Sequence, residues 1–175
     1  MRVSKLLESY NVKPEWLVFE ITESAVMAEP ALALETLTKL NKMGIELSLD
    51  DFGTGYSSLA YLKKLPVSEI KIDKSFIKDM ELDSNDTVIV RSTIALGHNL
   101  GMKVVAEGVE NIQIWDLLTD LGCDASQGYY MSRPLTASAL DEWLASSSWA
   151  KNMRLSAESF QGVERRKVMR DLPAK

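Results

Sequence analysis

Strand-like and helix-like segments alternate regularly along this chain, which limits the folds open to it. Apolar runs with strand character are expected to form five strands, at residues 17–22, 45–52, 70–73, 103–107 and 125–130. Strands that alternate with helices predict parallel pairing with right-handed crossovers. The sequence therefore predicts an α/β fold, and it leaves open whether the five strands form an open sheet or part of a βα barrel.

The expected helices fill the segments between these strands. Pro30 begins a helix that Gly44 ends, and a longer helix starts at a Ser84 or Asp86 cap and stops at Gly101. No Gly-x-Gly-x-x-Gly or Walker loop follows the first strand, so the usual nucleotide-binding sheets find no support. The other expected helices cover residues 1–8, 57–62 and 111–121, and a last one is capped by Thr136 and packed through Leu140, Trp143 and Leu144.

Composition excludes several classes of protein. The 175 residues carry a net charge of −5 and are 46% hydrophobic, which fits one domain with a sizeable core. A pI near 5.0 argues against binding to nucleic-acid polymers as the main activity. The single cysteine, Cys123, excludes an internal disulfide framework, and no apolar run approaches the roughly 18 residues of a membrane span. Without an apolar secretory leader, we expect a cytoplasmic location.

The end of the chain differs in charge from the rest. Residues 151–175 contain seven Lys/Arg and three acids, a net charge of +4, so residues 1–150 carry a net charge of −9. We expect a folded domain over residues 1–146 and a basic tail, helical or disordered, over residues 147–175. The tail is either a solvated appendage or a segment that binds an anion or a partner.

Polar side chains stand at the carboxyl ends of the expected strands. In a βα barrel such groups converge on one face, where catalytic residues gather. Two adjacent carboxylates, Asp50 and Asp51, are costly at a strand end for a purely structural purpose, because like charges repel. Gly53 and Gly55 follow them, so the backbone turns sharply there. The full set of strand-end groups is Glu20, Asp50, Asp51, Lys71, Glu107 and Gln127.

This set favours metal-assisted chemistry on a phosphate ester. Carboxylate oxygens are preferred ligands of Mg²⁺ and Mn²⁺, so Glu20, Asp50 and Asp51 are expected to hold one or two such ions. Lys71 would neutralise charge in the transition state or orient the attacking water. Glu107 would accept a proton or hold a water.

Structural interpretations compete with these roles. Lys71 could form an ion pair that merely balances the acids, and Gln127 could make a loop hydrogen bond. His98 lies next to Gly97 in a helical pattern and is expected to be structural or on the surface. Cys123 is expected to be a small buried residue, since no base for a nucleophile is evident.

At these residues the chain resembles the EAL family of bacterial phosphodiesterases, which hydrolyse the second messenger cyclic di-GMP. The resemblance runs over about residues 3–144 and implies a modified TIM barrel. Of that (β/α) barrel the chain would contain about five parallel strands with flanking helices, and the closing strands would be missing. The segments that carry the resemblance, in family order, are residues 20–24, 50–59, 71–77, 106–110 and 127–129.

The resemblance also implies a role for each matched residue. Glu20, Asp50 and Asp51 would bind Mg²⁺ or Mn²⁺, with Asp50 shared between two ions. The reaction would open cyclic di-GMP to linear pGpG. The residues that handle the attacking water or the substrate would be Lys71, Glu107 and Gln127.

Four further residues would support this site. Glu23 would brace the loop at residues 52–57, to which Thr54 belongs. Asp73 would stand beside Lys71, and Glu110 would support the loop that follows Glu107.

The sequence departs from the family pattern in three respects. It contains no Glu-Ala-Leu, the motif whose glutamate binds metal in the family, and no asparagine ligand on a preceding strand. About three strands are absent relative to a barrel of roughly 240 residues. With fewer ligands we expect weaker metal binding and little or no hydrolysis by this chain alone.

An incomplete barrel has two open edges and an exposed apolar interior, which a stable protein must cover. We expect a homodimer, association with a complete partner domain, or marginal stability; closure with fewer strands is disfavoured. Two other functions stay open: a non-catalytic module that binds cyclic di-GMP or regulates a partner, and a different metal-dependent barrel enzyme acting on a carbonyl acid. The set of motifs disfavours the last.

Overall fold

The computed structural model describes residues 2–55 and 59–149. Nearly all of the expected basic tail, together with the first residues of the expected helix at 57–62, lies outside the described residues. No helix within the described ranges is long and apolar enough to cross a lipid bilayer.

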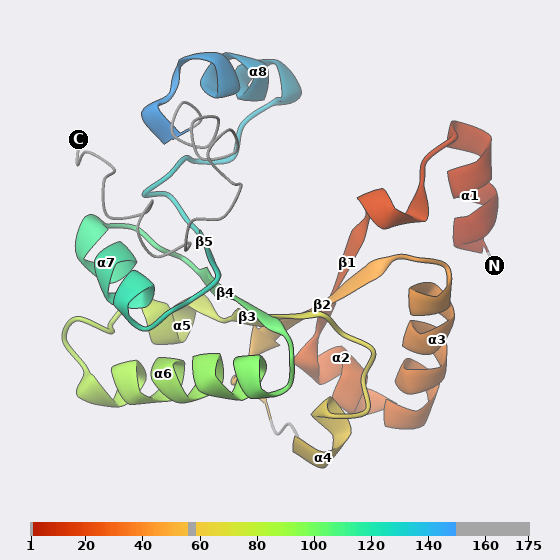
Figure 1. Ribbon diagram of the computed structural model, residues 1–175, viewed down its shortest axis with the longest axis horizontal. Helices are drawn as coiled ribbons and strands as arrows, with labels where there is room; N and C mark the ends of the chain where they lie inside the picture. Colours follow the sequence, from red (N-terminus) through yellow and green to blue (C-terminus); the bar gives the residue numbers. More distant parts are fainter. Residues whose placement is uncertain (1, 56–58, 150–175) are drawn as a thin grey trace, which may run out of the picture.

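One sheet of five parallel strands organises the fold (Figure 1). The strands follow one another in the sheet in their order along the chain, so β1 and β5 are its two edges and the sheet is not closed. The α/β fold with five parallel strands and no closure is therefore confirmed. The strands are β1 (Val18–Thr22), β2 (Glu46–Phe52), β3 (Glu69–Ile72), β4 (Lys103–Glu107) and β5 (Ala125–Gln127).

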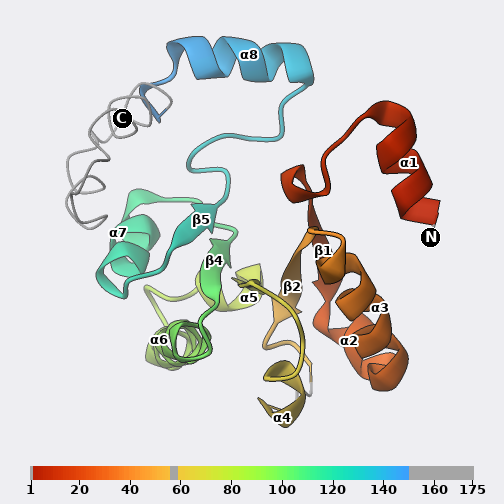
Figure 2. The same ribbon diagram turned by 45° about the vertical axis from the view of Figure 1, so that its right-hand side comes forward.

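The helices lie outside the curved sheet. In Figure 2, α2 and α3 lie beside β1 and β2 at the right of the view, and α6 and α7 lie beside β4 and β5 at the left. Sequential strand order with crossovers of one hand places successive helices on one face, as in a barrel and unlike a doubly wound sheet. The helices are α1 (Arg2–Tyr10), the 3₁₀ turn η1 (Pro14–Trp16), α2 (Glu23–Ala28), α3 (Pro30–Lys42), α4 (Leu59–Leu62), α5 (Lys74–Ile77), α6 (Ser84–Asn99), α7 (Ile112–Asp120) and α8 (Ala137–Ser146).

The core consists of two apolar clusters. The first joins the β2 residues Leu47 and Leu49 to α2 and α3. The second joins Val104 of β4 to α6 and α7. Fully burying such side chains stabilises a fold by about 1.5–3 kcal/mol each, so both halves of the sheet hold their helices firmly.

Side-chain caps fix where several helices begin. Thr136 caps α8 as expected, and its hydroxyl accepts a hydrogen bond from the Ala139 amide. For α6 the expected cap was Ser84 or Asp86, and this was wrong. The cap is Asp83, whose carboxylate accepts from the amide of Asn85. A short carboxylate one residue before the helix reaches the free amides of its first turn.

Some short elements differ from the sequence-based expectation. The helices α2 and α5 and the turn η1 were not expected, because segments of three to six residues are too short to show helical periodicity. Strand β5 ends at Gln127 and not at Tyr130, since Gly128 starts a turn in which the Tyr130 amide donates to the carbonyl of Val109.

Helix α8 does not pack as expected. Leu140 and Leu144 are 44% and 40% exposed, and no residue of α8 is buried. Figure 1 shows α8 away from the sheet, at the end of an extended segment that leaves β5. No further strand among the described residues offers a surface beneath it. The aromatic residue that does pack against the body of the fold is Trp149, which follows α8 in the chain.

Trp149 returns to the second core cluster. Its ring centroid lies 5.0 Å from that of Trp115 in α7 and 5.5 Å from that of Tyr130. Three aromatic rings therefore fasten the segment after α8 to the body of the fold. Trp149 lies beyond the expected domain boundary at residue 146.

Candidate functional site

The expected site residues lie at the carboxyl ends of the strands, and they lie on one side of the sheet because the strands are parallel and in register. Thr22 of β1 lies opposite Asp50 of β2, and Glu107 of β4 lies opposite Gln127 of β5. Side chains that leave the carboxyl ends of neighbouring strands therefore enter the same region.

A bulge in β2 sets the direction of the two aspartates. Leu49 pairs with Ile70 and Phe52 with Ile72, so β2 holds one residue more than β3 over this stretch. Asp51 is left-handed, with φ 54°, a rare conformation for a residue other than glycine. Side chains of adjacent residues in a regular strand point to opposite faces, and a bulge removes this constraint.

Local hydrogen bonds hold the bulge. The Asp51 amide donates to Asp50 Oδ1 at 3.0 Å. The hydroxyl of Thr54 donates to the carbonyl of Asp51 at 2.9 Å, which closes the turn after β2. Thr54 thus contacts the backbone of the acidic pair rather than its carboxylates.

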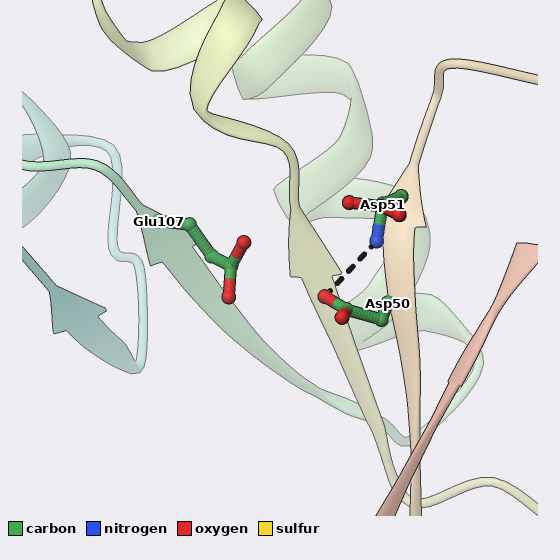
Figure 3. Close-up of side chains that lie close together, drawn as sticks. All are labelled: Asp50, Asp51 and Glu107. Atoms are coloured by element: carbon green, nitrogen blue, oxygen red, sulfur yellow. Dashed lines mark hydrogen bonds between the residues drawn. The ribbon is translucent and has the colours of Figure 1, made fainter.

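Three carboxylates converge at this point. Asp50, Asp51 and Glu107 each offer an oxygen, and these oxygens lie within 4.8 Å of one another. Figure 3 shows Asp50 and Glu107 on opposite sides of β3, with Asp51 next to Asp50. All three residues are half-buried. A set of carboxylate oxygens at this spacing fits a hard divalent cation such as Mg²⁺ or Mn²⁺.

Lys71 lies buried among these acids, only 4% exposed. Its Nζ is 2.6 Å from Glu107 Oε1, 2.8 Å from Glu20 Oε1 and 3.6 Å from Asp50 Oδ1. Burial by itself would lower the pKa of Lys71. Hydrogen bonds to Glu107 and Glu20, with the charges of Glu107 and Asp50, outweigh burial and raise its pKa above the ordinary value. Lys71 is therefore a charged donor in this structure.

Glu20 occupies a different place from the two aspartates. It pairs with Lys71, and its side chain is 53% exposed. The carboxylate that joins Asp50 and Asp51 is that of Glu107, which comes from β4. The grouping in the described residues is thus Asp50, Asp51 and Glu107, where the sequence suggested Glu20, Asp50 and Asp51.

Glu23 is buried beneath the turn that follows β2. It is 1% exposed, and its Oε2 accepts a hydrogen bond from the Gly53 amide at 2.9 Å. Its other oxygen, Oε1, is buried and has no hydrogen-bond partner among the described residues. A Cβ at Gly55 would lie 2.9 Å from Oε1, so the turn closes tightly on this carboxylate.

No side-chain hydrogen bond or ion pair in the described part of the chain joins the remaining expected residues to this cluster. Gln127 is exposed, and its carbonyl accepts from the Val109 amide. Asp73 caps α5 by accepting from the Ser75 amide; burial would raise its pKa, but the hydrogen bonds from Ser75 lower it. Glu110 is exposed, and within residues 2–55 and 59–149 it has no hydrogen bond or ion pair.

His98 and Cys123 have structural contacts. His98 Nε2 lies 2.8 Å from Asp124 Oδ2, which also accepts from the Val104 amide. Cys123 was expected to be buried but is half-buried; its thiol lies within hydrogen-bond distance of the carbonyls of Val104 and Ala125, and burial raises its pKa to about 11. Neither residue touches the acidic cluster.

Two glycines that the sequence did not single out shape the rim of the site. A Cβ at Gly128 would lie 2.0 Å from the carbonyl oxygen of Val109, so the loops after β4 and β5 touch through their backbones. Gly108 has φ 74°, and a Cβ there would lie 2.6 Å from that of Lys74. The available signal was a glycine directly after each polar strand end, at Glu107 and Gln127.

Comparison with known proteins places this geometry in a family. The model of the EAL domain matches residues 1–134. The bifunctional diguanylate cyclase/cyclic di-GMP phosphodiesterase MucR of Pseudomonas aeruginosa is 46% identical over 138 residues, which are 79% of this chain and 20% of MucR. The chain thus spans about a fifth of that relative.

Solved structures agree. The PaMucR phosphodiesterase in a c-di-GMP complex matches with a TM-score of 0.77 and 46% identity, over 79% of this chain and 56% of that one. The BlrP1 manganese/cy-diGMP complex from Klebsiella pneumoniae matches with a TM-score of 0.70 and 32% identity, over 75% of this chain and 34% of that one. The sequence, the open five-stranded sheet and the acidic cluster at its edge lead to one conclusion: the chain belongs to the EAL domain family.

Proposed function

We propose that this chain carries part of a metal-dependent phosphodiesterase site for cyclic di-GMP. One observation carries the proposal: the carboxylates of Asp50, Asp51 and Glu107 lie within 4.8 Å of one another, and the ammonium of Lys71 contacts two of them. MucR and PaMucR are both described as phosphodiesterases, which supports the choice of reaction and substrate.

Asp50, Asp51 and Glu107 would hold Mg²⁺ or Mn²⁺, with Glu20 at the edge of the site as a further ligand. When bound, the ion would supply a positive charge that polarises the phosphodiester and stabilises negative charge in the transition state. The manganese in the BlrP1 complex supports this choice of ion.

The residues of the chain would divide the remaining work. Water attacks phosphorus, one phosphodiester P–O bond breaks, and the ring opens to linear pGpG. Lys71, held in its charged form, would donate hydrogen bonds to the phosphate and offset its growing charge. Glu107 would accept a proton of the water, and Gln127 would hold the water or the substrate.

The supporting residues would act on the loops around this site. Glu23, through the Gly53 amide, and Thr54, through the Asp51 carbonyl, would fix the turn that places the aspartates. Asp73 would hold the start of α5 after Lys71. Glu110 would support the loop that follows Glu107.

Binding should exceed turnover in this chain. The 175 residues contain no Glu-Ala-Leu, and metal affinity depends on the number and geometry of ligands. We therefore propose that the chain binds a divalent cation and cyclic di-GMP but hydrolyses it little or not at all. The second candidate function, a binding or regulatory module, is favoured by the same incomplete ligand set.

The open sheet also suggests a partner. Both β1 and β5 pair on one side only among the described strands, which leaves backbone groups available at two edges. A second copy or a complete EAL domain would cover them.

Two measurements test the proposed function. Calorimetric titration with cyclic di-GMP in Ca²⁺ should show binding, which Asp50→Asn abolishes and Asp141→Asn, an exposed carboxylate of α8, leaves intact. Chromatography of the nucleotide after incubation with Mg²⁺ or Mn²⁺ should show little pGpG. Absence of nucleotide binding would refute the proposed substrate, and abundant pGpG that depends on Asp50 would refute the weak turnover.

A further inference from the structure

Lys71 is the one cation among the buried polar residues of the described chain; the others are Glu23, Ser48 and Thr93. Removing an ammonium from water costs several kcal/mol unless charges of opposite sign and hydrogen bonds compensate. The side chain must therefore be held by strong contacts, and these identify what the charge does.

The contacts of Lys71 reach three strands. Its Nζ pairs with Glu20 on β1, Asp50 on β2 and Glu107 on β4, while the lysine itself belongs to β3. Its ammonium donates hydrogen bonds to Glu107 and Glu20, and Asp50 Oδ1, at 3.6 Å, contacts it through charge alone. One positive charge thus joins four adjacent strands at their carboxyl ends.

The ammonium shares its partners with the proposed ion. Asp50 and Glu107 contact Lys71, and the same two residues contribute oxygens to the cluster with Asp51. Carboxylates this close repel one another strongly when nothing positive lies between them. Lys71 supplies that charge from within the chain.

We propose that Lys71 is a resident counter-cation, which holds the carboxylates together without a divalent ion and competes with the ion for Asp50 and Glu107. This inference rests on the metal site proposed above. The ammonium would then have two roles: it would neutralise the carboxylates, and it would contact the phosphate of the substrate. The affinity of the site for a divalent cation is then the outcome of a competition built into the fold.

The test compares Mn²⁺ binding by the chain, by Lys71→Met and by Lys103→Met. Lys103 is an exposed lysine at the opposite end of β4, so its variant removes the same charge outside the site. Mn²⁺ alone is titrated calorimetrically, and the thermal midpoint is followed with and without the ion. Without it, Lys71→Met should melt lower than the parent chain, because the carboxylates lose their counter-charge.

Lys71→Met should bind Mn²⁺ at least about tenfold more tightly, a gain of about 1.4 kcal/mol, and saturating ion should recover most of its thermal midpoint. Lys103→Met should match the parent chain in both measurements. Equal or weaker binding by Lys71→Met overturns the inference and leaves the metal site standing. If neither the parent chain nor Lys71→Met binds Mn²⁺, the metal site and the inference are both overturned.

A second measurement does not require the variant to fold. In the parent chain, Mg²⁺ should move the ¹³Cε resonance of Lys71 and leave that of Lys103 in place. A Lys71 resonance that stays unmoved while the carboxylate signals of Asp50 and Glu107 shift would overturn the competition.

Discussion

Replacing Gly128 by alanine should destabilise the fold severely, because the added methyl group meets backbone and not a movable side chain. Its Cβ would lie 2.0 Å from the carbonyl oxygen of Val109, 2.4 Å from its nitrogen and 2.7 Å from its carbonyl carbon. Carbon atoms cannot approach so closely, so the loop after β5 would have to leave the loop after β4.

The magnitude follows from what that separation breaks. The Val109 amide donates to the carbonyl of Gln127 at 3.1 Å, and the Tyr130 amide donates to the carbonyl of Val109 at 3.0 Å. Each bond contributes about 1 kcal/mol, and overpacking adds about 1–3 kcal/mol. The loss should be about 3–5 kcal/mol, a large share of the ~5–15 kcal/mol that stabilises a domain.

A second glycine supplies a matched control. A Cβ at Gly97, in α6, would lie 2.4 Å from Cγ2 of Val104, which is a side-chain methyl group and not backbone. Alanine is also the better helix former, by about 1 kcal/mol. Gly97→Ala should therefore cost at least about 2 kcal/mol less than Gly128→Ala, although both glycines pack closely.

The assay is urea unfolding followed by tryptophan fluorescence, which gives the free energy of unfolding for the three proteins. Mn²⁺ titration below the transition then reports on the site, since the displaced loop follows Glu107. A Gly128→Ala chain within about 1 kcal/mol of the parent, or less affected than Gly97→Ala, would refute the reasoning from backbone contact.

Three further experiments test separate contacts. Glu23→Ala should lose about 1–3 kcal/mol and weaken Mn²⁺ binding, whereas Glu23→Gln, which keeps an acceptor for the Gly53 amide, should lose less; equal losses in denaturation would contradict this. Because burial raises the pKa of Cys123 to about 11, the protonated thiol favours the folded state below the unfolded value of 9.0, and that contribution disappears as pH rises through 11. At pH 8 an aromatic disulfide reagent should label Cys123 of the folded chain much more slowly than free cysteine, because little thiolate is present, and the rate should rise with urea; labelling of the folded chain at the rate of free cysteine would argue against it. Trp149→Ala should cost about 1–3 kcal/mol and Trp149→Phe less, because an aromatic ring on Trp115 is kept; unchanged melting of the alanine variant would exclude the contact.

Much of the fold could be predicted because it follows from local pattern. Strand β4 has the expected bounds, Lys103–Glu107, since a short apolar run ends there at a charged residue and a glycine. The packing of α8 could not be predicted in this way. Its apolar residues have helical spacing, but spacing does not tell whether another surface lies opposite them.

The site also combines features that local pattern predicts with features that it does not. The sequence identified the polar residues at strand ends, and the structure brings Glu20, Asp50, Asp51, Lys71 and Glu107 together. It did not foresee that Gln127 would be exposed or that Gly128 would join two loops. Those outcomes depend on contacts between segments far apart in the chain.

The amino-acid sequence alone was enough to predict the order of strands and helices, the acidic pair near the end of β2 and the lysine near the end of β3. These follow from periodicity and from residue types along one segment. The sequence could not show that Glu107 joins Asp50 and Asp51, or that Lys71 lies between Glu107, Glu20 and Asp50. Cross-strand register and the bulge at Asp51 set these distances, and both arise only when strands pair and cores pack.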